Sequence, residues 1–326
     1  MGGSPEGRGG VVATASYEAR KFGIRSAMSS KTAQKLCPEV LFVPPRFDVY
    51  KEVSRSFHQI LHRYTDIIEP LSLDEAYLDV TEDKLGIGSA IEIAQSIQTA
   101  VLSELNLTIS AGVSINKFLA KVASDLQKPA GLTFIGPSRV ESFMESLDVN
   151  KFYGVGKVTT EKMQKLGLFK GKDLKKMTEN ELVFHFGKMG HFFYQIVRGI
   201  DDRPVQSYRE IKSVSVEDTY PEDLEDLEKI QKELYILVDR LIIRLDKRKL
   251  NGRTLTVKIK FHDFTQITRS LSTPFAIYDK PAMLSLLDKI IGNLDLKSQK
   301  IRLLGVGISN FIDNDNKWNS AQLALF

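Results

Sequence analysis

From residue 211 onward the spacing of hydrophobic residues switches between that of strands and that of helices, in an order that is compatible with few folds. Alternating residues predict a strand at 213–220, SVSVEDTY, and apolar residues at helical spacing follow over 224–248. The remaining segments are two strands at 253–264 and 268–274, a helix at 281–292 and a strand at 301–311. The order strand–helix–strand–strand–helix–strand predicts a compact sheet with both helices on one face.

Strand patterns also alternate with helical patterns before residue 133. Strands are predicted at 11–15 (VVATA), 76–81 (AYLDVT) and 107–114 (LTISAGVS). Helices are predicted within 46–65, 89–106 and 116–127, and Ser89 with Glu92 forms a capping box at the start of the second. We therefore expect an α/β or α+β domain here.

A small helical unit lies between these two parts, over residues 136–203. Glycines mark its turns, and a capping box of Thr178 and Glu181 opens one of its helices. The polar stretch GIDDRPVQSYRE then predicts a linker. The whole chain is thus predicted to be an α+β multidomain protein.

Composition narrows the class of protein. The chain has 326 residues, of which 42% are hydrophobic and 26% are charged, as in soluble globular proteins. Its one cysteine, Cys37, excludes an internal disulfide, and no apolar run reaches the roughly 20 residues of a membrane span. We expect a cytoplasmic protein that acts as a monomer and has no membrane partner.

Charge is unevenly distributed. The net charge is only +4, but residues 217–228 hold seven acids and no base, and residues 240–260 hold eight bases and one acid. Such segregation predicts either a basic face that follows phosphate groups or only a solvated helix and hairpin.

Two adjacent acids, Asp74 and Glu75, precede the predicted strand at 76–81. Neighbouring residues of a regular strand point to opposite faces, so both can serve one site only where the chain turns or bulges. Two carboxylates that lie close together are suitable ligands for Mg²⁺. An isolated acid pair, however, more often faces solvent and has no role in metal binding.

Two basic segments offer phosphate donors. In SYEARKFGIRS, Tyr17 supplies a hydroxyl and Arg20 a bidentate guanidinium, unless the segment is only an exposed basic helix. In SDLQKPAG, Lys128 could reach a triphosphate or could merely complement the end of a helix.

The segment FYGVGKVTTEKMQKLGL has a tight turn that leads into a helix. Backbone N–H groups at Gly154 and Gly156, with Lys157 beside them, favour a phosphate group at the positive end of the helix dipole. This is the pattern of a helix-hairpin-helix that grips DNA without regard to sequence.

The last five residues form an apolar peptide after a polar tail. Gln322, Leu323, Leu325 and Phe326 indicate a peptide that docks in a partner's pocket, with a folded-back short strand as the alternative. The five histidines show no zinc-ligand spacing.

Taken in order, these motifs closely resemble the Y-family DNA polymerases, the translesion enzymes, in their DNA polymerase IV branch. The resemblance extends over nearly the whole chain and is carried by RGGVVATASYEARKFGIRSAM, PLSLDEAYLDVT, SAGVSINKFLAKVASDLQKPAG, YGVGKVTTEKMQKLG and KSVSVEDTY. It implies a right-hand polymerase with fingers at 1–46, palm at 47–135, helix-hairpin-helix thumb at 136–205, linker at 206–210, little finger at 211–312 and a tail at 313–326.

The resemblance also implies a role for each candidate residue. Asp74 would bind Mg²⁺, of which two ions are expected, and Glu75 would assist at the primer 3′ end. The other implied roles are dNTP binding by Tyr17, Arg20 and Lys128, primer–template DNA binding by Gly154, Gly156, Lys157, Lys212 and Ser213, and binding of the bacterial sliding clamp by Gln322, Leu323, Leu325 and Phe326. Low fidelity and a part in DNA repair are expected of the family.

One part of the family pattern has no counterpart here. Members begin with an apolar strand that carries Asp-x-Asp, followed by an aromatic residue that excludes ribonucleotides, and on the order of 30 residues, one strand plus one helix, are not matched. Glu6 lies in a Gly/Pro-rich leader and Asp79 should point away from Asp74, so neither replaces that ligand. We expect little or no polymerase activity from residues 1–326 alone.

The sequence leaves one rival hypothesis from another class. The chain could be a non-catalytic DNA- and clamp-binding protein derived from such an enzyme. A helix-hairpin-helix nuclease is a weaker alternative, because Tyr17, Arg20 and Lys128 together indicate nucleotide binding.

Overall fold

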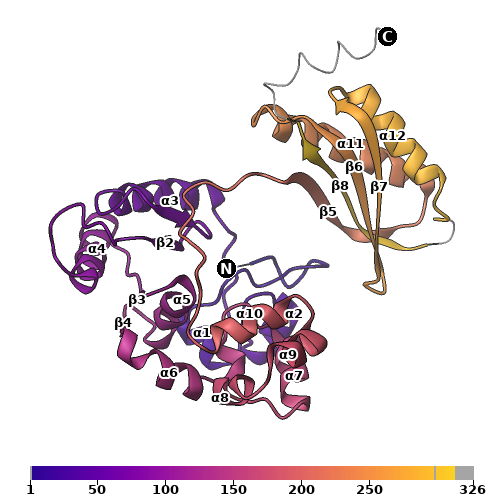
Figure 1. Ribbon diagram of the computed structural model, residues 1–326. Coiled ribbons are helices and arrows are strands. Elements are labelled where there is room, and N and C mark those ends of the chain that lie inside the picture. The colour runs from indigo at the N-terminus through magenta and orange to yellow at the C-terminus, as the bar shows by residue number, and fades with distance from the viewer. Residues whose placement is uncertain (1, 297–298, 313–326) are drawn as a thin grey trace, which may run out of the picture. The chain divides into compact units, whose positions relative to one another are not determined.

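The protein folds into two units. The structure is a computed structural model that describes residues 2–296 and 299–312, and Figure 1 traces them by residue number. One unit combines Met1–Pro45 with Glu210–Phe326, and the other is Arg46–Arg209. No helix among the described residues is long and apolar enough to cross a membrane.

The unit Arg46–Arg209 holds two small sheets and most of the helices. Strands β1 (Ile68–Pro70) and β2 (Ala76–Leu78) pair antiparallel, and β3 (Ala111–Ser114) and β4 (Leu132–Ile135) pair parallel. Its helices are α3 (Phe47–Leu61), α4 (Ala90–Leu105), α5 (Lys117–Leu126), α6 (Val140–Ser146), α7 (Lys157–Lys165), α8 (Gly171–Lys175), α9 (Glu179–Phe186) and α10 (Met189–Ile196), with short 3₁₀ turns at Pro137–Arg139 and Val149–Lys151.

Side-chain caps start several of these helices where the sequence predicts them. Ser89 accepts a hydrogen bond from the Glu92 backbone N–H at the start of α4, and Asn116 caps α5 in the same way. Thr178 and Glu181 form a reciprocal capping box at α9. Capping satisfies N–H groups that have no partner within the helix.

Two apolar clusters hold this unit together. The first joins α3, α4 and β1 through residues such as Ile60, Ile68 and Ile97. The second buries Phe118 and Leu119 of α5 among the helices after residue 136. Helix α5 lies very close to β3, because a Cβ on Gly112 would be only 2.0 Å from the Ala120 carbonyl oxygen. Helix α5 is thereby fixed in position on both sides.

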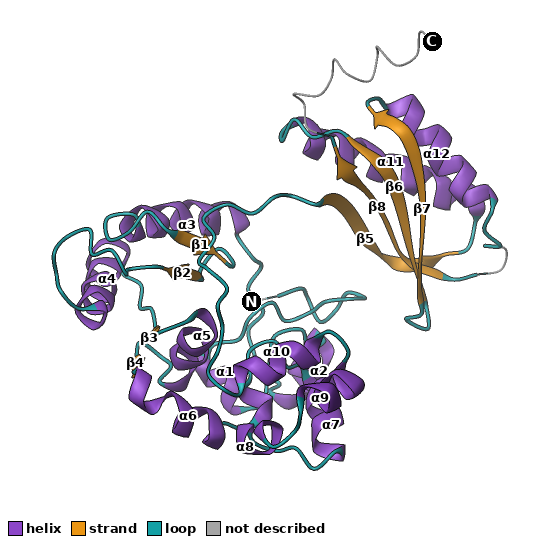
Figure 2. Cartoon of the chain, in the orientation of Figure 1, coloured by secondary structure: helices purple, strands orange, loops and turns teal. Residues whose placement is uncertain are grey.

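The other unit contains the predicted βαββαβ arrangement. Its strands form one sheet, and Figure 2 shows the long helices on one face of that sheet. The strand order is β5-β8-β6-β7, all antiparallel. The elements are β5 (Ser213–Leu224), α11 (Leu227–Asp246), β6 (Gly252–Phe261), β7 (Gln266–Ile277), α12 (Lys280–Gly292) and β8 (Ile301–Phe311).

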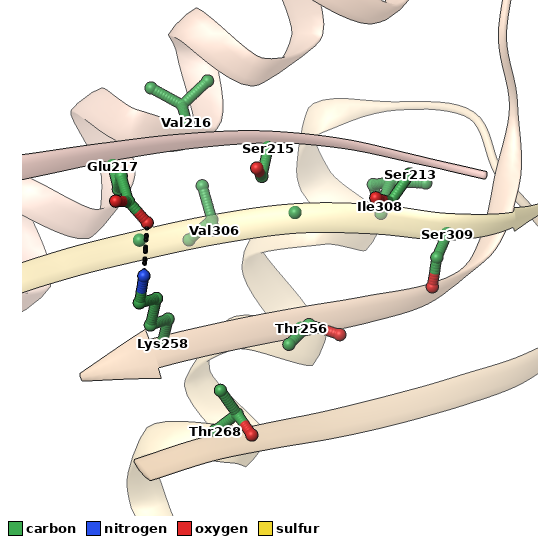
Figure 3. Close-up of a pocket in the computed structure, with 12 residues that line it drawn as sticks. Ser213, Ser215, Val216, Glu217, Thr256, Lys258, Thr268, Val306, Ile308 and Ser309 are labelled. Atoms are coloured by element: carbon green, nitrogen blue, oxygen red, sulfur yellow. Dashed lines mark hydrogen bonds and ion pairs between the residues drawn. The ribbon is translucent and has the colours of Figure 1, made fainter. Parts of the chain in front are cut away.

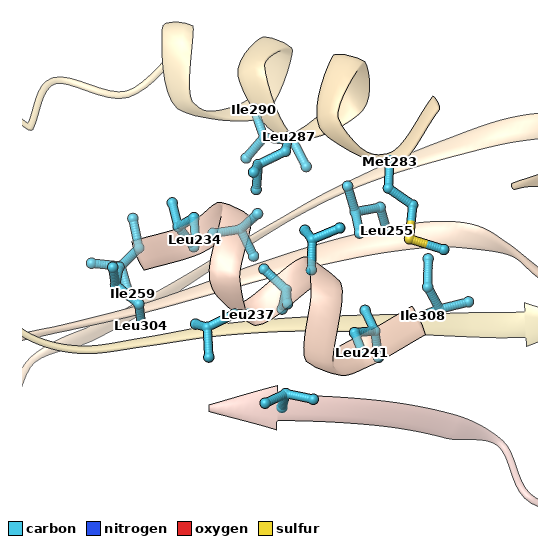
Figure 4. Close-up of a cluster of buried hydrophobic side chains, with 14 of the residues drawn as sticks. Leu234, Leu237, Leu241, Leu255, Ile259, Met283, Leu287, Ile290, Leu304 and Ile308 are labelled. Atoms are coloured by element: carbon cyan, nitrogen blue, oxygen red, sulfur yellow. The ribbon is translucent and has the colours of Figure 1, made fainter. Parts of the chain in front are cut away.

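The core of this sheet lies between the strands and the helices. Figure 4 shows Leu234, Leu237 and Leu241 of α11 and Leu287 of α12 directed at side chains of β6 and β8. All of the side chains labelled there are almost completely buried. The expected fold class, α+β with a helical thumb and a βαββαβ domain, is confirmed.

The predicted strand at 11–15 is wrong. Val11 and Val12 make only isolated bridges, to Ser29 and Gly2 respectively, and Val11 is 44% exposed. Val12 instead joins a small cluster with Ile24 and Ala33 near helices α1 (Tyr17–Lys21) and α2 (Ser30–Leu36). Apolar residues alone do not make a strand, because a ladder needs a neighbour that continues the pairing.

Candidate active site and nucleic-acid surfaces

Asp74 and Glu75 lie in the turn of the β1–β2 hairpin. The Leu71 and Ser72 N–H groups both donate to the Glu75 carbonyl oxygen, at 2.8 and 3.3 Å, and close the turn. The Ser72 hydroxyl donates to Asp74 Oδ1 at 2.5 Å. Strand alternation does not apply within this turn, so the condition under which both carboxylates can serve one site is met.

Glu75 is held by a lysine of helix α5. Lys121 Nζ lies 3.3 Å from Glu75 Oε1, and the lysine side chain is only 11% exposed. The same Nζ lies 3.5 Å from Asp125 Oδ2, one helical turn further on, and 5.7 Å from the centre of the Tyr153 ring. The sequence reasoning missed Lys121 and its part in this cluster.

Asp125 extends this cluster to Lys128. Lys128 Nζ lies 2.5 Å from Asp125 Oδ1, so Glu75, Lys121, Asp125 and Lys128 alternate in charge along one row. Burial by itself would raise the pKa of Asp125, but the hydrogen bond from Lys128 and the charge of Lys121 outweigh it and hold that pKa below its ordinary value. We call these four residues the charged row.

The sequence does contain a signal for the charged row. Lys117, Lys121 and Asp125 recur at intervals of four, which places them on the same side of a helix. Lys117 makes a parallel contact of its own, since its Nζ lies 2.6 Å from Glu69 Oε2 and 5.5 Å from the Tyr77 ring centre. Only the fold, however, reveals which strand residues face these lysines.

The oxygen donors suit Mg²⁺ in kind but are few in number. Asp74 and Glu75 are hard carboxylates, which magnesium prefers. Within residues 2–296 and 299–312, no group of three or more His, Cys, Asp or Glu side chains is placed to hold a metal ion. Lys121 also competes for Glu75. The pair therefore fits magnesium only if substrate phosphates and water supply the other ligands.

The segment that follows α10 is bound to other parts of the unit Arg46–Arg209. The Asp201 side chain is 2% exposed, accepts the Phe118 backbone N–H at 3.0 Å and pairs with Arg203. Gln206 N–H donates to Glu69, and Ser207 bonds the Ile68 N–H. Residues 201–207 thus have no helix or strand, yet they are anchored.

Tyr17 and Arg20 belong to the other unit, on the short helix α1. Ser16 caps this helix, and the Arg20 guanidinium carbon lies 5.8 Å from the centre of the Tyr17 ring. Arg20 Nε also donates to the Ala15 carbonyl oxygen at 3.0 Å. The side chains of Arg20 and the exposed Tyr17 therefore lie next to one another.

The turn before α7 has the geometry expected of a phosphate site. Gly154 has φ +90°, a region that favours glycine, and Gly156 is the N-cap of α7 without any side-chain cap. A Cβ on either glycine would meet nothing within 4 Å. The Lys157 side chain is 89% exposed. The first N–H groups of α7 and one cation are thus accessible from solvent.

The helix-free face of the β5-β8-β6-β7 sheet carries a shallow hollow of about 330 Å³. Figure 3 shows the hydroxyls of Ser213, Ser215, Thr256 and Ser309 around it, from three strands. Ser213 therefore lines this hollow, and Lys212 beside it is exposed.

The segregated charges of the sequence partly neutralise one another on this sheet. Lys258 pairs with Glu217 at 2.8 Å, and Arg240 pairs with Asp218. Glu217 of β5 and Lys258 of β6 lie on the two strands that flank β8, and Arg240 lies on α11, which packs against β5. These two bases therefore do not form an open basic face. The predicted clamp-binding residues 322–326 lie outside the described part of the chain.

Comparison with known proteins gives consistent matches along the chain. The impB/mucB/samB family model matches residues 2–125, the IMS family HHH motif matches 137–168, and the C-terminal domain of the same family matches 211–325.

Two curated relatives are half identical to the chain. The DNA polymerase IV of Akkermansia muciniphila is 50% identical over 94% of this chain and 86% of its own length. The DNA polymerase IV of Clostridioides difficile is 50% identical over 99% and 88%.

Solved structures of Y-family DNA polymerases are also similar to this chain. A Y-family DNA polymerase chimera of Dbh and Dpo4 superposes with a TM-score of 0.84 and 29% identity, over 94% of this chain and 88% of its own. An insertion ternary complex of Dbh DNA polymerase has a TM-score of 0.65, with the same identity and coverage.

Proposed function

This chain belongs to the Y-family of DNA polymerases, in the DNA polymerase IV branch, and on that premise we propose that it catalyses template-directed addition of dNTPs to a primer 3′ end, as a lesion-bypass enzyme. The observation that carries the proposal is the charged row. It connects a carboxylate of the hairpin turn to Lys128, a candidate triphosphate contact, through two ion-paired residues of one helix. A site that joins a primer hydroxyl to a triphosphate needs both kinds of group close together.

Within this proposal the site residues have separate roles. Asp74 is exposed in the turn and would bind Mg²⁺ together with triphosphate oxygens and water. Bound magnesium supplies a lower pKa for the primer hydroxyl and neutralises charge on the leaving pyrophosphate oxygens. Glu75 would assist at the primer end. Tyr17, Arg20 and Lys128 would hold the triphosphate.

DNA would be held by backbone contacts rather than by base recognition. The α7 N-terminus with Gly154, Gly156 and Lys157 supplies one phosphate site, and Lys212 with Ser213 supplies another. Contacts of this kind hold a duplex regardless of sequence. The division of the chain into fingers, palm, thumb and little finger is part of the same proposal, as is binding of the sliding clamp by residues 322–326.

A second candidate function is supported by the small number of carboxylates. Because the described residues contain no group of three potential metal ligands, a DNA-binding protein without catalysis is the alternative. Primer extension separates the two. We expect residues 1–326 to bind primer–template DNA and to add dNTPs slowly, with Asp74→Ala lowering the rate on the order of 100-fold or more.

The controls for this assay are direct. Asp83→Ala removes a carboxylate that only accepts hydrogen bonds within its own loop, at Leu85 and Gly88, and should leave the extension rate unchanged. DNA binding without any dNTP addition would favour the non-catalytic alternative. Rapid addition by residues 1–326 would contradict our expectation that a two-carboxylate site works poorly.

A further inference from the structure

Phe264 occupies an uncommon conformation at the turn between β6 and β7. Its φ is +69°, which bulky residues rarely adopt, and the residue is 61% exposed. The turn is held in place by a hydrogen bond from the Phe264 N–H to the Phe261 carbonyl and by Asp263, which accepts from the Thr265 N–H and hydroxyl. A strained, exposed aromatic residue in a turn that hydrogen bonds hold in place suggests a functional role for that residue.

Two cations flank this ring. Lys260 Nζ lies 5.3 Å from the ring centre, and the Arg302 guanidinium carbon lies 4.8 Å from it. Both distances are within the range of cation–π attraction. In the part of the chain that the structure describes, neither cation forms an ion pair, whereas neighbouring Lys258 and Lys300 are paired with Glu217 and Glu225.

A strand irregularity directs Arg302 to this place. On β6, Lys260 pairs with Leu303 and Phe261 pairs with Ile301, so Arg302 has no partner there. Such a bulge adds one residue to a strand and re-aims its side chain. The β5–β8 pairing also shifts between Leu303 and Ile301. Two local irregularities, the bulge and the positive φ, therefore bring Arg302 and Phe264 together.

The group lies on the side of the sheet away from the helices. Ile259 of β6 packs into the core beneath α11 and α12, so strand alternation turns Lys260 to the helix-free face, as it turns Lys258 into the hollow of Figure 3. Asp263 is the one acid in the turn itself, and its carboxylate is engaged by Thr265. Two unpaired cations held by a ring suit a phosphodiester better than a carboxylate side chain, because they can contact successive phosphates of one strand.

We propose that Phe264 is a positioning residue that holds Lys260 and Arg302 ready for the phosphodiester backbone of bound DNA. The inference rests on the proposed function, since DNA is its ligand. It adds a specific claim: removing the ring disorders the two cations and costs phosphate contacts, although the ring itself need not touch the DNA.

The test is the salt dependence of DNA affinity. The full chain is titrated with a fluorescently labelled primer–template DNA at several KCl concentrations, and the dissociation constant is measured by anisotropy. Phe264→Gly removes the ring but suits the positive φ, so the turn is kept. We expect affinity to fall about threefold at low salt and the slope of log affinity against log salt to become shallower by about one.

Three further variants make the result specific. Phe264→Tyr keeps the ring and should retain wild-type affinity and slope. Arg302→Gln should weaken binding by itself, but should add little in the Phe264→Gly background, because the two residues act as a unit. Lys289→Gln removes an exposed charge from α12, on the helical side of the sheet, and controls for net charge alone.

The outcomes separate this inference from the proposed function. If the wild-type chain binds DNA and Phe264→Gly leaves affinity and slope unchanged, the inference is wrong and the proposed function stands. It is also wrong if the Phe264→Gly and Arg302→Gln losses are fully additive. If the wild-type chain does not bind primer–template DNA, both are overturned.

Discussion

Lys121 Nζ and Glu75 Oε1 lie 3.3 Å apart, and this ion pair joins helix α5 to the hairpin that carries the candidate metal ligand. The contact stabilises the position of Glu75, but it also neutralises that carboxylate. Any divalent cation that approaches Asp74 and Glu75 must therefore do so beside the positive charge of Lys121, whose side chain is only 11% exposed.

Removal of that charge should strengthen metal binding. We predict that Lys121→Met raises the affinity of the chain for Mn²⁺, used as a spectroscopic substitute for Mg²⁺, by roughly fivefold, because a nearby like charge is lost. The measurement is electron paramagnetic resonance of Mn²⁺ titrated with protein. Lys121→Arg keeps the charge and is the matched control. An unchanged affinity in Lys121→Met would show that the cation does not bind at this hairpin.

The two glycines before α7 should respond differently to alanine. Gly154 has φ +90°, so Gly154→Ala should destabilise the protein by about 1–2 kcal/mol through backbone strain alone. Gly156 has φ −85° and open space around it, so Gly156→Ala should change the thermal midpoint little. Calorimetry of both variants checks this. Equal losses of stability would contradict it.

DNA affinity measured on the same two variants gives a second result. If phosphate approaches the α7 N-terminus closely, Gly156→Ala should weaken duplex binding even though the fold is intact, because the added methyl group lies at the phosphate site. Wild-type affinity in Gly156→Ala would remove this turn from the DNA-binding surface.

Asp201 should make folding stability sensitive to acid. Burial raises the pKa of this carboxyl. The hydrogen bond and charge of Arg203, together with the Phe118 N–H, lower the pKa by more than burial raises it, so the folded pKa lies below the ordinary value of 3.8. Its contribution is therefore complete well above pH 3.8 and is lost as the pH falls below that value towards the folded pKa.

The corresponding substitution is Asp201→Ala, which should lower the free energy of unfolding by about 2–3 kcal/mol at pH 7 because the Phe118 N–H and Arg203 lose their partner. Asp201→Asn keeps an acceptor and should cost less. Urea unfolding between pH 3 and 7 checks both variants. The difference between wild type and Asp201→Ala should shrink at the acid end, and a constant difference would refute the assignment.

Deletion of Gln322–Phe326 should abolish binding to a bacterial sliding clamp and leave DNA binding intact. The reason is that an apolar terminal peptide supplies anchors for a pocket, whereas the candidate DNA-binding residues lie elsewhere in the chain. A pull-down with purified clamp measures the first effect and DNA anisotropy the second. Clamp binding by the deleted form would count against this peptide as the binding segment.

Much of this protein is determined by local sequence. Ser89, Asn116 and Thr178 mark helix starts because a hydroxyl or amide side chain can satisfy an end N–H within a few residues. The strand and helix order after residue 211 follows from hydrophobic periods of two and 3.6, which depend on neighbouring residues only. The turn at Gly154 and the acid pair at Asp74 and Glu75 can also be recognised in the sequence, because each is a pattern of neighbouring residues.

Only the tertiary structure decided which of these residues meet. The strand predicted at 11–15 does not form, because strand pairing needs a neighbouring strand that is distant in sequence. Two bases of the run at 240–260, Arg240 and Lys258, are neutralised by ion pairs with Asp218 and Glu217 of β5. Lys121 joined Glu75, and a bulge turned Arg302 towards Phe264. Contacts between distant segments arise from packing and strand register, and no local pattern of residues specifies them.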